Sequence, residues 1–298
     1  MTQRRYRRIA AAAAALVACC LALSLWIVMR DRSASARSVS SVQLEPRQHG
    51  AVPGPGGPHG HARPAVLSVA TPLAACEARI AREAHRIPTV AIVGASYTAG
   101  TGPDNPELSW AVGLARLLHW NAVIYGVPGA GYVRAGDGRH GPMARMLSEE
   151  GLHGLGPALV IVQAGHDDVG VPAALESRRV GAAVNLVRAA APGARIALLT
   201  TFAVSPDGSP ALRQTDRAIV TGGTAADPDV IVMDPLAGRW VFPHAGGGLH
   251  PTAAGDTWIA RTVAAILRAH GVRPAPAASA TPVVCDASVG VGRPASAA

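Results

Sequence analysis

From residue 88 onward, short apolar runs alternate with longer amphipathic stretches. The runs are rich in β-branched residues and almost continuously apolar, which is typical of strands that are covered on both faces. They occupy residues 90–93, 122–125, 159–162, 196–200 and 230–233. The alternation of strands and helices with short connections predicts an α/β domain built on a five-stranded, doubly wound parallel sheet.

The stretches between the predicted strands place their apolar residues at helical spacing. We expect helices over residues 107–120, 172–190 and 251–270. A shorter helix is predicted before the first strand, and its spacing puts Cys76 on the apolar face.

The first 32 residues have the pattern of a membrane segment. Residues 9–29 contain no charged side chain, and as a helix they would span ~31 Å, about the apolar thickness of a bilayer. Four arginines precede this stretch, so the positive-inside rule places the N-terminus in the cytoplasm. We expect residues 1–32 to form a signal anchor, a single transmembrane helix that leaves the following domain outside the cell membrane.

Two other fates of this segment stay open. Ala34-Ser35-Ala36 has the small-residue pattern of a signal-peptidase site, and cleavage there would make the protein secreted. Residues 16–19 end in Cys19 and resemble a bacterial lipobox, in which case Cys19 would be acylated and the protein would be a lipoprotein.

Residues 33–72 are rich in Ser, Gly and Pro and predict a disordered tether, because such a segment cannot bury enough apolar surface to fold. A folded domain is expected over residues 73–272, followed by a Pro/Ala-rich tail over residues 273–298. Cys76 and Cys285 are the cysteines outside the membrane segment. Two thiols in an exported chain most simply form one disulfide.

Charge and composition narrow the possible functions. The formal net charge is +8, and seven Arg with one Asp within residues 1–37 supply +6 of it, which leaves +2 for the rest. We therefore expect no nucleic-acid partner. All 27 basic residues are Arg. Chemistry that needs a Lys amine, such as a Walker A phosphate loop or a Schiff-base cofactor site, is thereby excluded.

Candidate chemistry follows the predicted strands at their carboxyl ends, where parallel α/β sheets place their ligand sites. Ser96 lies in a Gly-rich turn after the first strand, where a hydroxyl and a backbone N–H are displayed together. A glycine block, residues 126–131, follows the second strand. Gly-His-Asp-Asp, residues 165–168, follows the third strand, and His250 directly precedes Pro251 at the start of the last helix.

In order and spacing, these four features resemble the sequence blocks of the SGNH, or GDSL-type, hydrolase superfamily across residues 89–270. The resemblance implies a three-layer, flavodoxin-like fold and hydrolysis of carboxylic esters of lipids or acylated sugars, without a metal or other cofactor. It implies Ser96 as the nucleophile and His250 as the general base. The oxyanion hole would comprise the N–H groups of Ser96 and Gly129 and the side chain of Asp167.

Two positions depart from the family pattern. The family's Asp three residues before the His is Gly247 here. Its backbone carbonyl is the candidate to orient the His250 ring, with Asp234 and Asp256 as further candidates. The family's oxyanion Asn is Asp167, and an ionised carboxylate cannot donate a hydrogen bond. Our hypothesis is that Asp167 donates only when protonated, which predicts faster ester hydrolysis in mild acid.

The sequence thus predicts a tethered extracellular serine esterase that acts as a monomer on small-molecule, glycan or lipid esters. An acyltransferase that passes the acyl group to a sugar hydroxyl would use the same Ser96 and His250. A degenerate, non-catalytic domain that binds a glycan or cell-wall polymer is favoured by Gly247 and Asp167 and opposed by the retained nucleophile and base. The aromatic residues of segment 240–242 are candidates for lining an acyl or sugar pocket.

Overall fold

The structure, a computed structural model, describes residues 72–103, 106–136, 140–149, 152–205, 207–246, 248–276 and 281–288. The anchor expected over residues 1–32 lies outside the described residues, as does the tether except for its last residue. Within the described ranges, no helix has both the length and the apolar character needed to cross a membrane.

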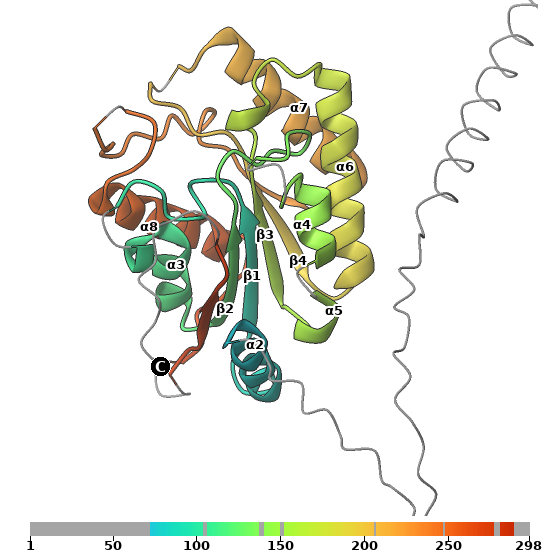
Figure 1. The fold of residues 1–298 in the computed structure, drawn as a ribbon, viewed down its shortest axis with the longest axis vertical. Helices are drawn as coiled ribbons and strands as arrows, with labels where there is room; N and C mark the ends of the chain where they lie inside the picture. Colours follow the sequence, from blue (N-terminus) through green and yellow to red (C-terminus); the bar gives the residue numbers. More distant parts are fainter. Residues whose placement is uncertain are drawn as a thin grey trace, which may run out of the picture. The chain divides into compact units, whose positions relative to one another are not determined.

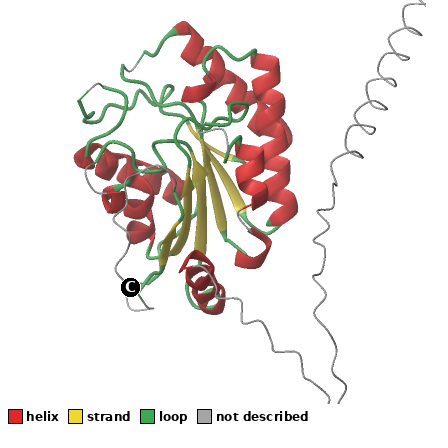
Figure 2. Ribbon diagram, viewed as in Figure 1, coloured by secondary structure: helices red, strands yellow, loops and turns green. Residues whose placement is uncertain are grey.

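The described residues form a six-stranded parallel sheet with the order β5-β4-β3-β1-β2-β6. Figure 2 shows the strands in yellow between the red helices. The strands are β1 (Thr89–Gly94), β2 (Asn121–Gly126), β3 (Leu159–Gln163), β4 (Arg195–Leu199), β5 (Ile231–Met233) and β6 (Val284–Asp286). The first five have the strand order of flavodoxin. The predicted fold class is therefore confirmed, whereas the predicted number of strands is one too few.

Helices cover both faces of the sheet (Figure 1). On one face lie α3 (Trp110–Leu118) and α8 (Ala253–Ala269), and on the other lie α4 (Met143–Glu149), α6 (Ala173–Ala190) and α7 (Pro210–Ala226). Side chains alternate between the two cores along β1, β3, β4 and β5, so Ile92 of β1 joins the α3/α8 core and Val93 joins the α4/α6 core. The expected three layers follow from strands that are apolar on both faces.

The predicted helices agree with the observed ones except at their ends. Segment 107–120 folds as a 3-10 turn, η1 (Pro106–Leu108), followed by α3, while 172–190 and 251–270 correspond to α6 and α8. The side chain of Ser109 accepts the N–H of Val112 and caps α3, which separates the helix from the turn before it. In the same way, Thr252 caps α8 and delays its start to Ala253.

Helix α7 was not predicted, because its sequence contains the poor helix formers Gly222 and Gly223. Both glycines are buried where α7 packs on α6 and the sheet. A Cβ at Gly222 would overlap the backbone oxygen of Ser177 in α6, and one at Gly223 would overlap the side chain of Leu198 in β4. Close packing of the two helices therefore outweighs the intrinsic cost of glycine.

The sixth strand lies in the segment that was expected to be a tail. β6 pairs with β2 at the edge of the sheet, with Cys285 opposite Val123, and the side chain of Asn121 accepts the N–H of Val283 at 2.9 Å. Cys285 forms a disulfide with Cys76 of α2 (Pro72–Glu83), as the sequence predicts. The sequence did not predict β6, because a strand of three residues in a Pro/Ala-rich segment shows no clear periodicity.

Candidate active site

The candidate residues lie at the carboxyl ends of β1, β2 and β3. From β1 the chain adds β2 on one side, and it then adds β3, β4 and β5 on the other side. The strand order therefore reverses between β1 and β3. A doubly wound sheet offers its ligand crevice at such a reversal. Ser96 follows β1, Gly129 follows β2, and the 3-10 turn η2 (His166–Asp168) follows β3.

The turn that carries Ser96 is held tightly against β3. The N–H of Ala95 donates to the backbone oxygen of Gln163, and the Thr98 hydroxyl donates to the Gln163 side chain at 2.9 Å. A Cβ at Gly94 would lie 2.8 Å from that same backbone oxygen, so the turn requires glycine there. Ser96 is consequently presented on a rigid, half-buried turn.

His250 reaches Ser96 from the loop before α8. Its Nε2 lies 3.0 Å from Ser96 Oγ, which is hydrogen-bonding distance. The backbone oxygen of His250 accepts the N–H of Ala245 at 2.8 Å, and the Tyr97 hydroxyl donates to the backbone oxygen of Leu249. The turn of the nucleophile and the loop of the base are thus tied to each other directly.

The surroundings of His250 favour its neutral form. Burial lowers the pKa of its imidazole, and the nearby His166 lowers it further. A neutral imidazole has one nitrogen free to accept a proton. The sequence places His166 next to Asp167, where its charge could compensate that of the acid. Its place beside His250 becomes visible only when β3 and the α8 loop come together.

Trp240 and Phe242 are buried in the core and do not line the cavity that Gly129 and Asp167 border. They are 8% and 5% exposed. Phe202 lies between them and the site, with ring centroids 6.0 Å from Trp240 and 5.8 Å from Phe242, and it stacks on Tyr97 at 4.2 Å. Their expected role as pocket lining stays a prediction, since the loop that carries them folds inward and buries both rings.

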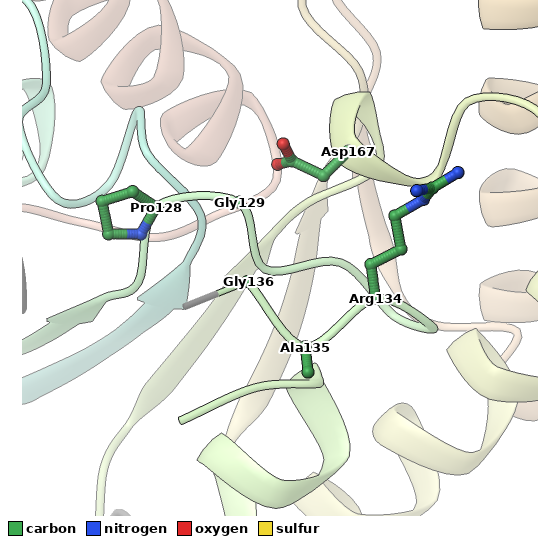
Figure 3. Close-up of a pocket in the computed structure, with 6 residues that line it drawn as sticks. All are labelled: Pro128, Gly129, Arg134, Ala135, Gly136 and Asp167. Atoms are coloured by element: carbon green, nitrogen blue, oxygen red, sulfur yellow. The ribbon is translucent and has the colours of Figure 1, made fainter. Parts of the chain in front are cut away.

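Gly129 and Asp167 line a cavity of about 600 Å³, whose lining does not include Ser96 or His250 (Figure 3). The cavity is lined by Pro128, Gly129, Arg134, Ala135, Gly136 and Asp167. Gly129 has a φ of +77°, which favours glycine. Among the described residues, the N–H groups of Ser96 and Gly129 have no hydrogen-bond acceptor. Both are thus available to a bound oxyanion.

Asp167 extends toward the loop that bears Gly129, whereas the Arg134 side chain follows the other side of the cavity (Figure 3). Burial raises the pKa of the Asp167 carboxyl group, and Asp168 raises it further, while His166 and Arg134 oppose the shift. The net increase favours the protonated form over the range where an ordinary Asp is already ionised. A protonated carboxyl group can donate a hydrogen bond.

The candidates for orienting the His250 ring have different positions. Gly247 lies outside the described residues, so its role stays a prediction. Asp234 accepts the N–H of Ala237 at 2.8 Å and closes the turn after β5. Asp256 accepts the N–H of Trp110 at 2.8 Å and thereby anchors the start of α3. Both carboxylates thus have structural partners of their own.

Two buried acids near the site were given no role from the sequence. Asp168 accepts backbone N–H groups of the loop after Gly129, and Glu176 lies on the first turn of α6. The sequence shows Asp168 at the end of the Gly-His-Asp-Asp segment. Its partners are backbone N–H groups, which leave no signal in the sequence. Within the described ranges, no cluster of three His, Cys, Asp or Glu residues is arranged to hold a metal ion.

Comparison with known proteins places the chain in a family. The sequence profile of the GDSL-like lipase/acylhydrolase family matches residues 92–258, which is 167 of 298 residues. A GDSL lipase of Mycobacterium tuberculosis is 27% identical over 195 residues, covering 61% of this chain and 83% of the relative.

Solved structures show the same fold. A carbohydrate esterase family 2 enzyme with a carbohydrate-binding domain, from Corynascus thermopiles (Myceliophthora fergusii), has a TM-score of 0.51 and 19% identity over 62% of this chain and 67% of that one. A salicylyl-acyltransferase from a tetracycline biosynthetic pathway has a TM-score of 0.51 and 19% identity over 64% and 56%. With the profile match across more than half of its length, the chain belongs to the GDSL-like lipase/acylhydrolase family and is an ester-bond hydrolase.

Proposed function

We propose that this chain is an exported serine esterase that cleaves carboxylic esters of acylated sugars or lipids, with Ser96 as the nucleophile and His250 as the general base. The observation that carries the proposal is the 3.0 Å separation of Ser96 Oγ and His250 Nε2 at the carboxyl end of the sheet. A hydroxyl within hydrogen-bonding reach of a neutral imidazole is what nucleophilic acyl transfer requires.

The first half of the reaction forms an acyl-enzyme. With its proton on Nδ1, the His250 ring accepts a hydrogen bond from Ser96 through Nε2. Ser96 Oγ attacks the ester carbonyl carbon, its proton passes to Nε2, and the carbonyl electrons move onto oxygen. The bond from this carbon to the alcohol oxygen then breaks, and His250 gives its proton to the leaving alkoxide.

The second half releases the acid. Water attacks the carbonyl carbon of the acyl-enzyme, and His250 Nε2 takes the proton of the water. The bond between the carbon and Ser96 Oγ breaks, and the proton returns to Oγ. Each half passes through a tetrahedral oxyanion, for which the N–H groups of Ser96 and Gly129 are fixed donors.

The pH dependence follows from Asp167 and His250 together. Asp167 donates to the oxyanion only while its carboxyl group is protonated, and its raised pKa extends that form into mild acid. The lowered pKa of His250 shifts protonation of the base to lower pH. The two shifts favour an optimum on the acid side of neutrality.

The cavity supports a compact substrate. Its volume of about 600 Å³ falls within the ~300–1,000 Å³ that is common for small-molecule sites. Its walls are glycine backbone, small side chains and the polar groups of Arg134 and Asp167, without a long apolar side chain. A short acyl group or a single sugar ring fits these walls better than a long acyl chain, so we expect acetyl and other short-chain esters to be preferred.

Export is supported by two features of the chain. Residues 9–29 are uncharged and follow four arginines. The domain also carries the Cys76–Cys285 disulfide, a bond that persists in oxidising compartments. Protease added to intact cells that express the full chain should digest the domain. Protection of the domain until the cells are lysed would contradict an extracellular location.

Hydrolysis of a chromogenic ester series from acetyl to decanoyl tests the proposed activity. The full chain should prefer the short esters, and Ser96→Ala should lower kcat/KM by about 10⁴-fold or more. Ser148→Ala is the matched control, because Ser148 is exposed on α4 and its hydroxyl bonds only to the backbone of Ala144. Equal activity of Ser96→Ala and the wild type would refute the role of Ser96.

The alternatives give different products. An acyltransferase would use the same acyl-enzyme, but adding an acceptor sugar would divert the acyl group from the free acid to a sugar ester. A non-catalytic binding domain is favoured by the Asp at position 167, because an ionised carboxylate cannot donate a hydrogen bond to an oxyanion. It would be established by a folded wild type that turns over no ester and binds a glycan.

A further inference from the structure

Two acids are buried beneath the oxyanion side of the candidate active site. Asp168 at the end of η2 and Glu176 in the first turn of α6 are both 0% exposed. Within the described residues, neither forms an ion pair with a basic side chain. A buried carboxyl group is costly unless it is hydrogen-bonded or neutral. The two acids therefore need partners or protons.

The carboxylate of Asp168 is satisfied by a run of backbone donors. Its oxygens accept the N–H groups of Tyr132 at 2.5 Å, Val133 at 3.3 Å and Arg134 at 2.9 Å. Gly131 makes this approach possible, because a Cβ there would overlap the carboxyl group of Asp168. Asp168 thus fixes the backbone of three consecutive residues.

Those three residues belong to the loop that forms the oxyanion side. The N–H of Gly131 donates to the backbone oxygen of Arg134 at 2.8 Å, and Ala130 forms a bridge with Ala135. Gly136 then packs back against Gly129, where a Cβ on Gly129 would lie 3.2 Å from it. By holding 132–134, Asp168 fixes the position of Gly129 and the cavity wall.

Glu176 needs a proton to be compatible with this arrangement. Both of its carboxyl oxygens are buried without a donor among the described residues, and its carboxyl group lies within hydrogen-bonding reach of Asp168. Two ionised carboxylates cannot bond to each other, but a protonated Glu176 can donate to Asp168. Burial and the adjacent Asp168 raise the pKa of Glu176 to about 9, which favours this state at neutral pH.

We propose that Glu176 and Asp168 form a positioning pair for the oxyanion hole, in which Glu176 donates its carboxyl proton in a hydrogen bond to Asp168 and Asp168 holds the loop that carries Gly129. The pair touches no substrate and acts through the loop. The expected effect of the pair on kcat rests on the proposed esterase function. Its expected effect on the backbone of the loop does not.

The pair makes the loop sensitive to alkali. When Glu176 ionises, it loses the proton that it donates and repels Asp168. The hydroxyl of Tyr132 is also buried, and its pKa is raised by that burial and, less strongly, by the charges of Glu176 and Asp168. Asp167 is a further titratable group beside the pair. The charge of Asp168 raises its pKa, and the charges of His166 and Arg134 lower it. The chain has no Lys, so few side chains besides Glu176 titrate near pH 9.

Two substitutions at Glu176 separate the proposal from a merely structural role. Glu176→Gln keeps a donor at every pH, while Glu176→Met keeps the size and removes the donor. We expect Glu176→Gln to retain kcat at pH 7 and to lose the wild-type decline above pH 9. We expect Glu176→Met to lower kcat roughly tenfold to hundredfold with KM little changed, which is less than or equal to the loss of an oxyanion donor.

Backbone hydrogen exchange supplies a readout that needs no activity. In Glu176→Met the amides of Tyr132, Val133 and Arg134 should exchange at least tenfold faster than in the wild type, and in Glu176→Gln at the wild-type rate. Unchanged exchange in a folded Glu176→Met, or a Glu176→Gln with the wild-type alkaline decline, would overturn the proposal. If Glu176→Met does not fold, the Glu176→Gln profile and the pH dependence of wild-type exchange decide. A wild type without esterase activity would refute the proposed function and leave the exchange result to judge the pair.

Discussion

The two sides of the candidate active site are held in place by different forces. The loop of His250 rests on aromatic packing, in which Tyr97 stacks on Phe202 and Phe202 contacts Trp240. The loop of Gly129 instead rests on hydrogen bonds from its backbone to the buried carboxylate of Asp168. Apolar packing holds one side, and a buried acid holds the other.

This difference separates how each side should respond to change. Aromatic contacts do not titrate, so damage to the aromatic packing behind the base should appear as lost stability at every pH. Carboxyl groups do titrate, so damage to the oxyanion side should appear as a change in rate or in its pH dependence. Variants of the two sides that changed stability and pH dependence in the same way would contradict the comparison.

Removal of the base should give the largest effect. His250→Ala leaves the aromatic packing intact but removes the group that accepts the Ser96 proton, so kcat/KM for a short-chain ester should fall about 10⁴-fold. His244→Ala is the matched control, because His244 lies in the same loop and its ring centroid is 4.5 Å from that of Phe242. Losses of similar size in both variants would show that the loop, and not the imidazole, carries the effect.

Truncation of the aromatic packing should come next. Phe202 is 1% exposed, and Phe202→Ala should lower the free energy of unfolding by about 3–5 kcal/mol because it leaves a cavity in the core. Urea denaturation measures this loss, and Leu108→Ala on the exposed turn before α3 serves as the control. The pH profile of the folded variant should match the wild type. A shifted profile would mean that the aromatic side also sets the charge state of the site.

Steric displacement of Asp168 should weaken the reaction with a smaller loss of stability. Gly131→Ala places a methyl group where the Asp168 carboxyl group lies, so the loop must move and kcat should fall about 10²-fold, as for a lost oxyanion donor. Gly154→Ala is the control, since a Cβ there meets no atom within 4 Å. Wild-type kcat in Gly131→Ala would argue against a fixed loop.

Exchange of Asp167 for a neutral donor should produce the smallest change, and it should be a gain. Asp167→Asn donates at every pH, so kcat/KM at pH 7.5 should rise about tenfold, a fraction of the full worth of an oxyanion donor. The wild-type advantage in mild acid should disappear, because the raised pKa of Asp167 makes its protonated form most abundant there. Superimposable pH profiles of the two proteins would refute a donor role for Asp167.

Stability should also depend on pH through Glu176. Its folded pKa of about 9 lies above its ordinary value of 4.5, so folding favours the protonated acid. Its contribution to stability is therefore fully present below about pH 4.5 and is lost as the pH rises toward 9. Thermal unfolding of Glu176→Gln should lack this decline between pH 5 and 9. A decline of equal size in the variant would place its origin elsewhere.

The sequence predicted the parts of the fold that depend on periodicity. Continuous apolar runs located β1 to β5, and polar residues at their ends pointed to Ser96 and His250. β6 was missed because three residues are too short for a period, and α7 because Gly222 and Gly223 serve packing at the expense of helix propensity.

The oxyanion side was only partly predictable for a different reason. Asp168 is positioned by its bonds to backbone N–H groups, and any sequence in the loop supplies such groups. Glu176 is a charged residue on a helix by pattern, and its burial depends on how α6 meets η2 in space. A fold can therefore be inferred from side-chain pattern, while a network of backbone and buried acid requires coordinates.

Labelling with a fluorophosphonate tests the central claim most directly. Intact-mass analysis of the folded full chain should show one phosphonyl adduct on the wild type, mapped by peptide sequencing to Ser96. Ser96→Ala should show none, and His250→Ala should react far more slowly because the Ser96 hydroxyl loses the base that lies 3.0 Å away. An unlabelled wild type, or equal labelling of wild type and Ser96→Ala, would contradict the account.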